Sequence, residues 1–417
     1  MGQEYRRYDR ATQEGSLLFD RRKLLQFLPV ALTGLGSVSA RPAVTGRRRA
    51  RELGIRIGQM QPGRWNAITD VSGVKVGHST IIRGSGKLVV GEGPVRTGVT
   101  AIWPQSNILQ NYLPCGYDMP NANGEVTGLL QIEKLGILAS PICLTNTSSV
   151  GMVYGAMLDR LPDDELPKVV PVVGETWDAW LNDTAGRHVH DKHVAEALER
   201  ASSGPVQEGS VGGGTGMISY GFKGGIGTAS RVLPPPLNGY TVGVLVQANH
   251  GGRSQLRIDG VPVGEAITDL RPDPDWARSL NSILMVVATD APLLDFQLDR
   301  VARRSVHGLA KTGSTSSNSS GDFTIAFSTA NPIPRGDFWK GSGYELQTLE
   351  QFDLNPLLVA VAEATEEAII NALFMAEDMT GVDDHKIRAL PIDRTLEIMK
   401  RHHRLFPVEE GKSEAHA

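Results

Sequence analysis

The apolar residues recur with two different periods along the chain, and this pattern predicts strands that alternate with helices. Short apolar runs predict strands at 74–82, 99–103, 142–145, 168–173, 283–288 and 322–329. Helical spacing predicts helices near 129–135, 149–161, 193–201, 356–376 and 394–404. Glycine-punctuated strands between 216 and 265 predict an antiparallel meander. Elements mixed in this way predict a layered α+β or α/β domain with helices on the outer faces.

A further helix is expected from about residue 291, after the apolar run at 283–288. Asp290 is expected to be its N-cap, because an aspartate oxygen can accept from the first free N–H groups of a helix. The residues expected on its apolar face are Leu294, Leu298, Val301 and Ala302.

Composition indicates an ordinary globular protein, since 40% of the 417 residues are hydrophobic and 21% are charged. A formal net charge of -4 argues against nucleic acid as a partner, because such partners require clustered Lys and Arg. The dense basic run Arg47–Arg49 is expected to be a solvated arm. Cys115 and Cys143 are compatible with one disulfide and equally with two free buried thiols.

Residues 1–40 have the features of an export signal. The pair Arg21–Arg22 precedes an uncharged stretch, Leu24–Ala40, that ends in small residues. We expect export by the twin-arginine route to the periplasm or the medium, with no stable membrane insertion after the signal is removed. An uncleaved anchor is the alternative, although the stretch is shorter than the roughly 20 residues that span a bilayer, and it contains Pro29.

The dipeptide Asn281–Ser282, directly before a buried strand, is the strongest candidate for chemistry. If its peptide bond is cut, Ser282 becomes an N-terminal residue whose Oγ is a nucleophile and whose own α-amine can act as the base. An uncleaved loop-to-strand junction is the alternative on the dipeptide alone. Cyclisation of the Asn281 side chain is a third possibility, and it predicts slow and partial breakage.

Several further motifs occur together with this dipeptide in one order and spacing. They are Gly73–His78, Thr97–Thr100, Val211–Gly216, Val244–Asn249, Leu256–Pro262, Val286–Leu293 and Ser319–Asp322. Over about residues 73–381 the chain resembles the self-processing serine aminopeptidase family of DmpA and the β-aminopeptidases. The resemblance implies an α+β fold, an αββα four-layer sandwich similar to N-terminal-nucleophile hydrolases but with different connectivity.

The resemblance also implies two chains from one catalytic domain, an N-terminal (α) chain 41–281 and a C-terminal (β) chain 282–417. The implied activity is release of N-terminal residues from short peptides, amides or esters through an acyl-enzyme on Ser282, without a cofactor. We expect a homo-oligomer of processed heterodimers. An acyltransferase resembling ornithine acetyltransferase is the alternative enzyme, although that family conventionally uses threonine. A non-catalytic binding protein with the same fold is the alternative outside enzymes.

The resemblance assigns roles to three further positions. Asn249 matches the oxyanion-hole asparagine, a role that suits a side-chain amide donor. Ser320 matches a proton-relay hydroxyl beside the nucleophile, and Asp322 its orienting carboxylate; two residues apart on a strand, they would face one side. Without the resemblance, Asn249 reads as a turn residue and the Ser320–Asp322 segment as a polar loop with a strand cap.

Trp177 aligns with a tyrosine of DmpA, and we expect it to contact substrate. Indole has an N–H donor but no hydroxyl, and Asn281 replaces a glycine of DmpA; both differences favour the β-aminopeptidase side. No metal site is expected from the polar tract His188–His193, because no further ligand is spaced to complete it. The glycine loop Gly212–Gly216 lacks the frame of a phosphate loop, and it is expected to shape the pocket or an intersubunit contact.

Overall fold

The computed structural model describes residues 46–161, 169–272, 281–336 and 343–407. The expected export signal at 1–40 therefore lies outside the described residues, as does Lys168 at the start of one expected strand. The helix expected at 149–161 is described to its end, and it stops three residues earlier than expected, at Leu158. The description below concerns the compact unit that begins at Gly46.

A seven-stranded sheet forms the centre of the molecule, with the strand order β13-β3-β12-β11-β10-β9 and β4 paired to β3. Its strands are β3 (Asn111–Ala122), β4 (Ile137–Leu138), β9 (Gly225–Val232), β10 (Thr241–Asn249), β11 (Asn281–Thr289), β12 (Ser320–Ser328) and β13 (Ile333–Pro334). β11 and β12 run parallel, whereas the other pairs are antiparallel.

A second sheet of four strands has the order β1-β2-β5-β6. Its strands are β1 (Lys75–Arg83), β2 (Val95–Trp103), β5 (Ile142–Asn146) and β6 (Val172–Thr176). The two sheets pack face to face around one buried apolar cluster, which includes Ile102, Leu144, Leu245 and Leu284. Gly174 of β6 allows the close approach, because a Cβ there would lie 2.7 Å from a methyl carbon of Leu284.

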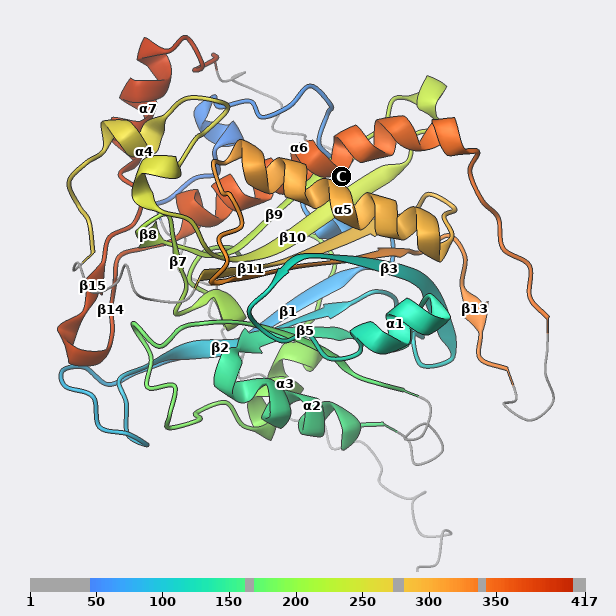
Figure 1. The fold of residues 1–417 in the computed structure, drawn as a ribbon, viewed down its shortest axis with the longest axis horizontal. Coiled ribbons are helices and arrows are strands. Elements are labelled where there is room, and N and C mark those ends of the chain that lie inside the picture. The colour runs from blue at the N-terminus through green and yellow to red at the C-terminus, as the bar shows by residue number, and fades with distance from the viewer. Residues whose placement is uncertain (1–45, 162–168, 273–280, 337–342, 408–417) are drawn as a thin grey trace, which may run out of the picture. The chain divides into compact units, whose positions relative to one another are not determined.

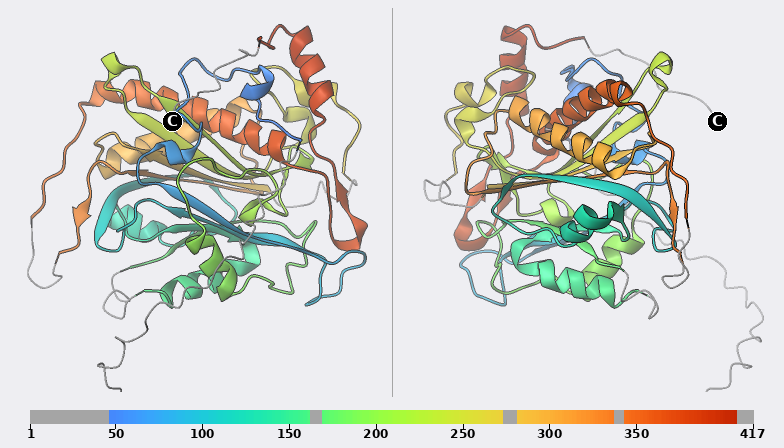
Figure 2. Two further views of the ribbon diagram at one scale, coloured as in Figure 1. Left: turned by 180° about the vertical axis from the view of Figure 1, so that it is seen from behind. Right: turned by 45° about the vertical axis from the view of Figure 1, so that its right-hand side comes forward.

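Helices cover the outer face of each sheet, as Figures 1 and 2 show. α5 (Asp295–Lys311) and α6 (Leu354–Met375) pack on the seven-stranded sheet, and α2 (Val150–Leu158) and α3 (Asp191–Glu199) pack on the four-stranded sheet. The layers are therefore α, β, β and α, which confirms the fold expected from the resemblance. The shorter helices are α1 (Leu129–Leu135), α4 (Val263–Ala266) and α7 (Ile392–Arg401). Two small hairpins pair β7 (Ile218–Ser219) with β8 (Phe222–Lys223) and β14 (Met379–Thr380) with β15 (Lys386–Ile387).

The apolar run of β11 follows from its place in the middle of the sandwich. Ile283, Met285 and Val287 join the core beneath α5 and α6, whereas the residues between them join the core between the sheets. A strand buried on both faces needs apolar residues at every position, so its sequence does not alternate.

One strand was missed, and two expectations about elements were wrong. β3 was not predicted, because Pro114 and Pro120 interrupt it. The expected meander ends at Asn249, and the chain beyond it forms the short helix α4 instead of a strand. Asp290 does not cap α5, which begins at Asp295; its carboxylate accepts from the backbone N–H of Thr241 at 2.7 Å.

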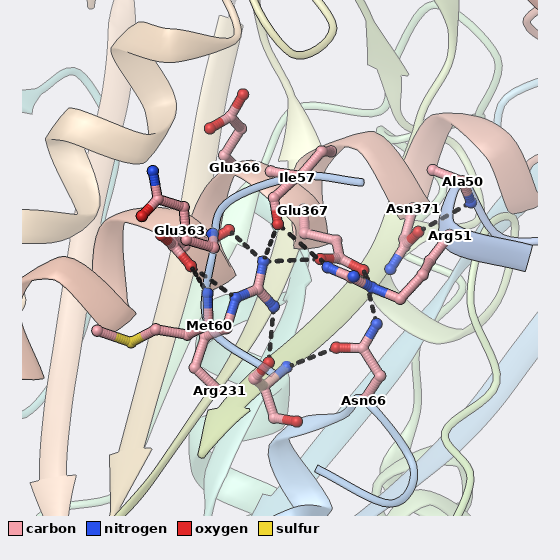
Figure 3. Close-up of polar contacts among 12 residues, drawn as sticks. Ala50, Arg51, Ile57, Met60, Asn66, Arg231, Glu363, Glu366, Glu367 and Asn371 are labelled. Carbon is pink, nitrogen blue, oxygen red and sulfur yellow. Dashed lines mark hydrogen bonds and ion pairs between the residues drawn. The ribbon is translucent and has the colours of Figure 1, made fainter. Parts of the chain in front are cut away.

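The expectation of a solvated arm at Arg47–Arg49 was also wrong, since only Arg48 is exposed. Arg47 donates to the carbonyls of Phe374 and Leu390, at 2.6 and 2.9 Å, and Arg49 pairs with the buried Glu208. The segment that follows the basic run lies along α6, and its contacts are shown in Figure 3.

Arg231 of β9 is the centre of the charged cluster in Figure 3, and none of its side chain is exposed. Its guanidinium lies 3.1 Å from a carboxylate oxygen of Glu363 and 2.7 Å from one of Glu367, both on α6. Arg51 is a second cation at the Glu367 carboxylate, at 2.6 Å. Although burial opposes ionisation of Glu367, Arg231 and Arg51 together keep its pKa below the usual value.

Cys115 and Cys143 are two free buried thiols, which decides between the two alternatives left by the sequence. They belong to different sheets, on β3 and β5. Within the described part of the chain, no helix combines the length and the apolar character that crossing a membrane requires.

Candidate active site

Three neighbouring strands bring the predicted site residues together at one end of the seven-stranded sheet. β10 ends at Asn249, and β11 begins at Asn281 beside it. Asn249 is the antiparallel partner of Ser282, and Ser282 is the parallel partner of Gly321. Strand register alone therefore brings together the predicted nucleophile, oxyanion donor and relay segment.

Ser282 is almost completely buried, with 3% of its surface exposed. Its hydroxyl donates to the carbonyl oxygen of Asn281 at 2.6 Å, and the N–H of Gly321 lies 3.4 Å from its Oγ. The hydroxyl therefore lies beside the carbonyl of the Asn281–Ser282 peptide bond. Since Leu284 points into the core between the sheets, the alternation of the strand places Ser282 on the same, sheet-facing side.

Asn249 is on that side as well, because Leu245, four residues earlier on β10, belongs to the same core. Only 4% of Asn249 is exposed. Its Oδ1 accepts from the backbone N–H of Ile218 at 2.8 Å. This contact assigns the oxygen end of the amide, so that Nδ2 is the end directed away from Ile218. The side chain is thus held in one orientation next to Ser282.

Ser320 and Asp322 share one side of β12, as the sequence predicted, and the Ser320 hydroxyl donates to Asp322 Oδ1 at 2.6 Å. Burial raises the pKa of Asp322, although the hydrogen bond from Ser320 opposes this. Thr324, on the same side, contacts Ser305 of α5 at 2.5 Å, so this is the helix-facing side of the sheet.

In the uncleaved chain that the structure describes, no hydrogen bond joins the Ser320 hydroxyl to Ser282. Ser320 instead pairs in register with Asn281, next to the peptide nitrogen that cleavage would convert into an amine. The pair Ser320 and Asp322 therefore lies beside the prospective base and not beside the Ser282 hydroxyl. A relay through these residues fits the amine of the cleaved form.

Trp177 follows the last residue of β6 and is half-buried. The preceding residue, Thr176, accepts from Gln247 Nε2 at 2.8 Å, two residues before Asn249 on β10. This contact places Trp177 at the end of the sandwich where the site lies.

Glu175 is a carboxylate at this end that the sequence analysis did not single out. It is 2% exposed and accepts from the backbone N–H of Glu125 at 3.1 Å and from the Thr147 hydroxyl. Burial raises its pKa. Its position two residues before Trp177, in the sequence Glu175–Thr176–Trp177, was the available signal.

Residues 66–387, more than three quarters of the chain, match the model of peptidase family S58. The chain belongs to peptidase family S58. It is 44% identical over 388 residues to the β-peptidyl aminopeptidase BapA of Sphingosinicella xenopeptidilytica, an alignment that covers 89% of this chain and 96% of that protein. The resemblance found in the sequence is thereby confirmed.

Solved structures agree with this S58 membership. A β-aminopeptidase of Burkholderia sp. superposes with a TM-score of 0.79 at 43% identity, covering 85% of this chain and 99% of that one. The L-aminopeptidase D-Ala-esterase/amidase of Ochrobactrum anthropi, described as a variant of the Ntn hydrolase fold, superposes with a TM-score of 0.79 at 40% identity, covering 86% and 99%. The predicted hydrolase class and aminopeptidase activity are confirmed, and neither the acyltransferase nor the binding protein is favoured.

The remaining candidate segments of this S58 peptidase have structural partners. His188 pairs with Asp183 at 2.8 Å, and the ring of His193 accepts from the N–H of His190 at 2.9 Å. Within the described residues, no group of three or more His, Cys, Asp or Glu is arranged to hold a metal ion. Gly212–Gly214 is a buried turn that contacts strands of both sheets. Its role in shaping the pocket or an intersubunit contact stays a prediction.

Proposed function

We propose that this chain is a self-processing serine aminopeptidase that cuts its own Asn281–Ser282 bond and then uses Ser282 as the nucleophile. The observation that carries the proposal is the contact of 2.6 Å between the Ser282 hydroxyl and the Asn281 carbonyl, directly opposite the oriented amide of Asn249. A buried serine at the start of a doubly buried strand has no packing role that alanine would not fill.

In the self-cleavage step, Ser282 Oγ attacks the Asn281 carbonyl carbon, and the Oγ proton is transferred to the departing Ser282 nitrogen. The C–N bond breaks and an ester joins Asn281 to Ser282. Water then hydrolyses the ester, which leaves a carboxylate on Asn281 and both a free hydroxyl and a free α-amine on Ser282. The tetrahedral intermediate carries an oxyanion that the Asn249 amide is oriented to receive.

In turnover, the Ser282 amine takes the Oγ proton while Oγ attacks the carbonyl of the substrate. The leaving amine departs with a proton, and water hydrolyses the acyl-enzyme. An α-amine has an ordinary pKa of about 7.7 to 8.0, so only about 10 to 17% is unprotonated at pH 7. Burial of the Ser282 amine would lower its pKa and so increase the fraction that can act as a base. Ser320 and Asp322 lie beside this nitrogen in the sheet and would orient it. The same nitrogen is a non-basic amide before cleavage, so activity requires maturation.

The substrates we propose are short peptides, amides or esters with a free amino terminus, with a preference for β-amino acid residues. The relatives named β-peptidyl aminopeptidase and β-aminopeptidase support this preference. An aminopeptidase must recognise an ammonium group, and Glu175 offers a carboxylate for it at the site end of β6. Trp177, two residues further, would contact the side chain of the substrate.

We also propose that residues 1–40 direct export to the periplasm or the medium through the twin-arginine route and are then removed. Support comes from the Arg21–Arg22 pair and the apolar stretch after it. The boundaries of the mature chains, 41–281 and 282–417, follow from this proposal and from the cut. Assembly into a homo-oligomer of processed heterodimers is proposed on the resemblance to the aminopeptidase family.

The test is the fate of the Asn281–Ser282 bond. Purified wild-type protein should give two fragments on a denaturing gel, and N-terminal sequencing of the smaller should begin at Ser282. The Ser282→Ala variant should stay as one inactive chain, because it lacks the attacking hydroxyl. Clean cleavage of the Ser282→Ala protein would show that an outside protease or asparagine cyclisation makes the cut.

A further inference from the structure

Lys223 is a buried lysine whose side-chain nitrogen is surrounded by backbone carbonyl groups. It lies on β8, with none of its side chain exposed, and no carboxylate among the described residues pairs with it. Its Nζ donates to the carbonyl oxygens of Gly214, Met217 and Gly224 at 3.2, 2.8 and 2.8 Å. An ammonium has three N–H donors, and these carbonyls use all of them. Burial lowers the pKa of Lys223 to about 7.

One of these carbonyls connects Lys223 to the active site. The Met217 carbonyl belongs to the same peptide group as the Ile218 N–H, which donates to Asn249 Oδ1 at 2.8 Å. Because the C=O and N–H of a trans peptide point in opposite directions, the hydrogen bonds form a chain from the ammonium through the peptide to the Asn249 amide. Bonds in such a chain polarise one another, most of all in a buried environment.

The hairpin that carries this peptide is fixed on its other sides. Its turn is formed by Tyr220 and Gly221, at φ angles of 53° and 68°, and Arg253 donates to both of their carbonyls, at 2.9 and 2.6 Å. The Tyr220 N–H donates to the carbonyl of His250, the residue after Asn249, at 2.7 Å. The peptide between Lys223 and Asn249 is therefore held against the strand end.

We propose that Lys223 is a positioning residue for the oxyanion-binding amide, acting through the Met217–Ile218 peptide group. It fixes the orientation of the Asn249 side chain, and the positive charge of its protonated form makes the Nδ2 end of that side chain a stronger donor to the oxyanion. The proposal deepens the proposed function and rests on it. It assigns to Lys223 an effect on turnover and on self-cleavage, because both reactions pass through an oxyanion next to Ser282.

The test is a double-mutant cycle of Lys223→Met and Asn249→Ala, read out as kcat and KM on an amino-acid p-nitroanilide and as the rate of self-cleavage. Lys223→Met alone should lower kcat by about tenfold or more with little change in KM, since a hydrogen bond to a charged group is lost from the chain. In the Asn249→Ala background the same substitution should change kcat by less than about twofold, because the amide through which it acts is gone. Lys311→Met, at a largely exposed lysine that pairs with Glu366, is the matched control and should leave kcat unchanged.

Equal losses from Lys223→Met in both backgrounds would overturn the proposal, as would no loss in the wild-type background. Thermal unfolding of each variant accompanies the kinetics. If Lys223→Met yields no folded protein, Lys223→Gln replaces it in the cycle. Because glutamine keeps an uncharged N–H donor, Lys223→Gln should lower kcat by less than the about tenfold expected for Lys223→Met. Wild-type protein that neither cleaves itself nor hydrolyses the anilide would overturn the proposed function, and the role of Lys223 with it. If the wild-type protein is active but the effects of Lys223→Met and Asn249→Ala on the free energy of activation add, only the proposed role of Lys223 is overturned.

Discussion

Asn249 offers the sharpest test of the chemistry, because the oxygen and the nitrogen of its side-chain amide have different roles. Oδ1 accepts from the Ile218 N–H, and Nδ2 is proposed to bind the oxyanion. Asn249→Ala removes both functions. Asn249→Asp keeps an oxygen for Ile218 but replaces the donor with a second acceptor. The two variants therefore separate a structural role of the side chain from donation to the transition state.

The expected magnitude follows from burial and register. Ser282 and Asn249 are directly opposite each other on antiparallel strands, so their Cβ atoms are within about 4.5 to 5.5 Å, a span that one amide can bridge to an oxyanion. Both residues are at most 4% exposed, so water does not substitute for the lost donor. We expect each variant to lower kcat by about 10² to 10³-fold, equivalent to about 2.7 to 4 kcal/mol, with a much smaller change in KM.

The assay measures kcat per cleaved active site, with the cleaved fraction taken from a denaturing gel, because slow maturation would otherwise imitate slow turnover. Asn249→Asp should be at least as slow as Asn249→Ala, since a carboxylate repels an oxyanion. Recovery of wild-type kcat by Asn249→Asp would refute the reasoning and leave Asn249 as a support for Ile218. Wild-type kcat in fully cleaved Asn249→Ala would remove the residue from the mechanism altogether.

Two further variants test the ion cluster and the substrate site. Arg231→Met should lower the free energy of unfolding by about 3 to 5 kcal/mol, because it leaves Glu363 buried without its cation and Glu367 with Arg51 alone. The control is the exposed Arg303, which pairs with Asp118. Arg303→Met should change the free energy of unfolding by less than about 1 kcal/mol, as measured by thermal unfolding. Glu175→Gln should raise KM for substrates with a free amino terminus much more than it lowers kcat, because it removes the proposed partner of the ammonium. An unchanged KM for Glu175→Gln would place ammonium recognition elsewhere.

The sequence predicted those parts of the fold that depend on local pattern. The doubly buried run of β11 and the helix α1 were found where their apolar residues place them. β3 was not found, because Pro114 and Pro120 argue against a strand in the sequence. The strand packs against α5 at Gly116, where a Cβ would lie 2.4 Å from the Asp299 nitrogen. Such a contact joins residues far apart in the chain and leaves no local signal.

The site was predicted to a similar extent. Family-like motifs indicated Ser282, Asn249, Ser320 and Asp322, and the strand register brings all four to one end of the sheet. The facing of Ser320 and Asp322 toward the helices could not be read from the motif, because it depends on which core each side of β12 joins. The proposed role of Lys223 was equally hidden, because it is linked to Asn249 through the Met217–Ile218 peptide group, and a backbone group leaves no signal in the sequence.

The order of strands in the large sheet has a consequence for the lifetime of the mature protein. β3, β9 and β10 precede the proposed cut and β11, β12 and β13 follow it, so β3 lies between two strands of the later fragment. Folding of the uncut precursor is a unimolecular reaction, whereas refolding after cleavage requires two separate chains to meet and interleave. Maturation would therefore make unfolding effectively one-way at low concentration, and the working life of the enzyme would be set by its unfolding rate and not by an equilibrium.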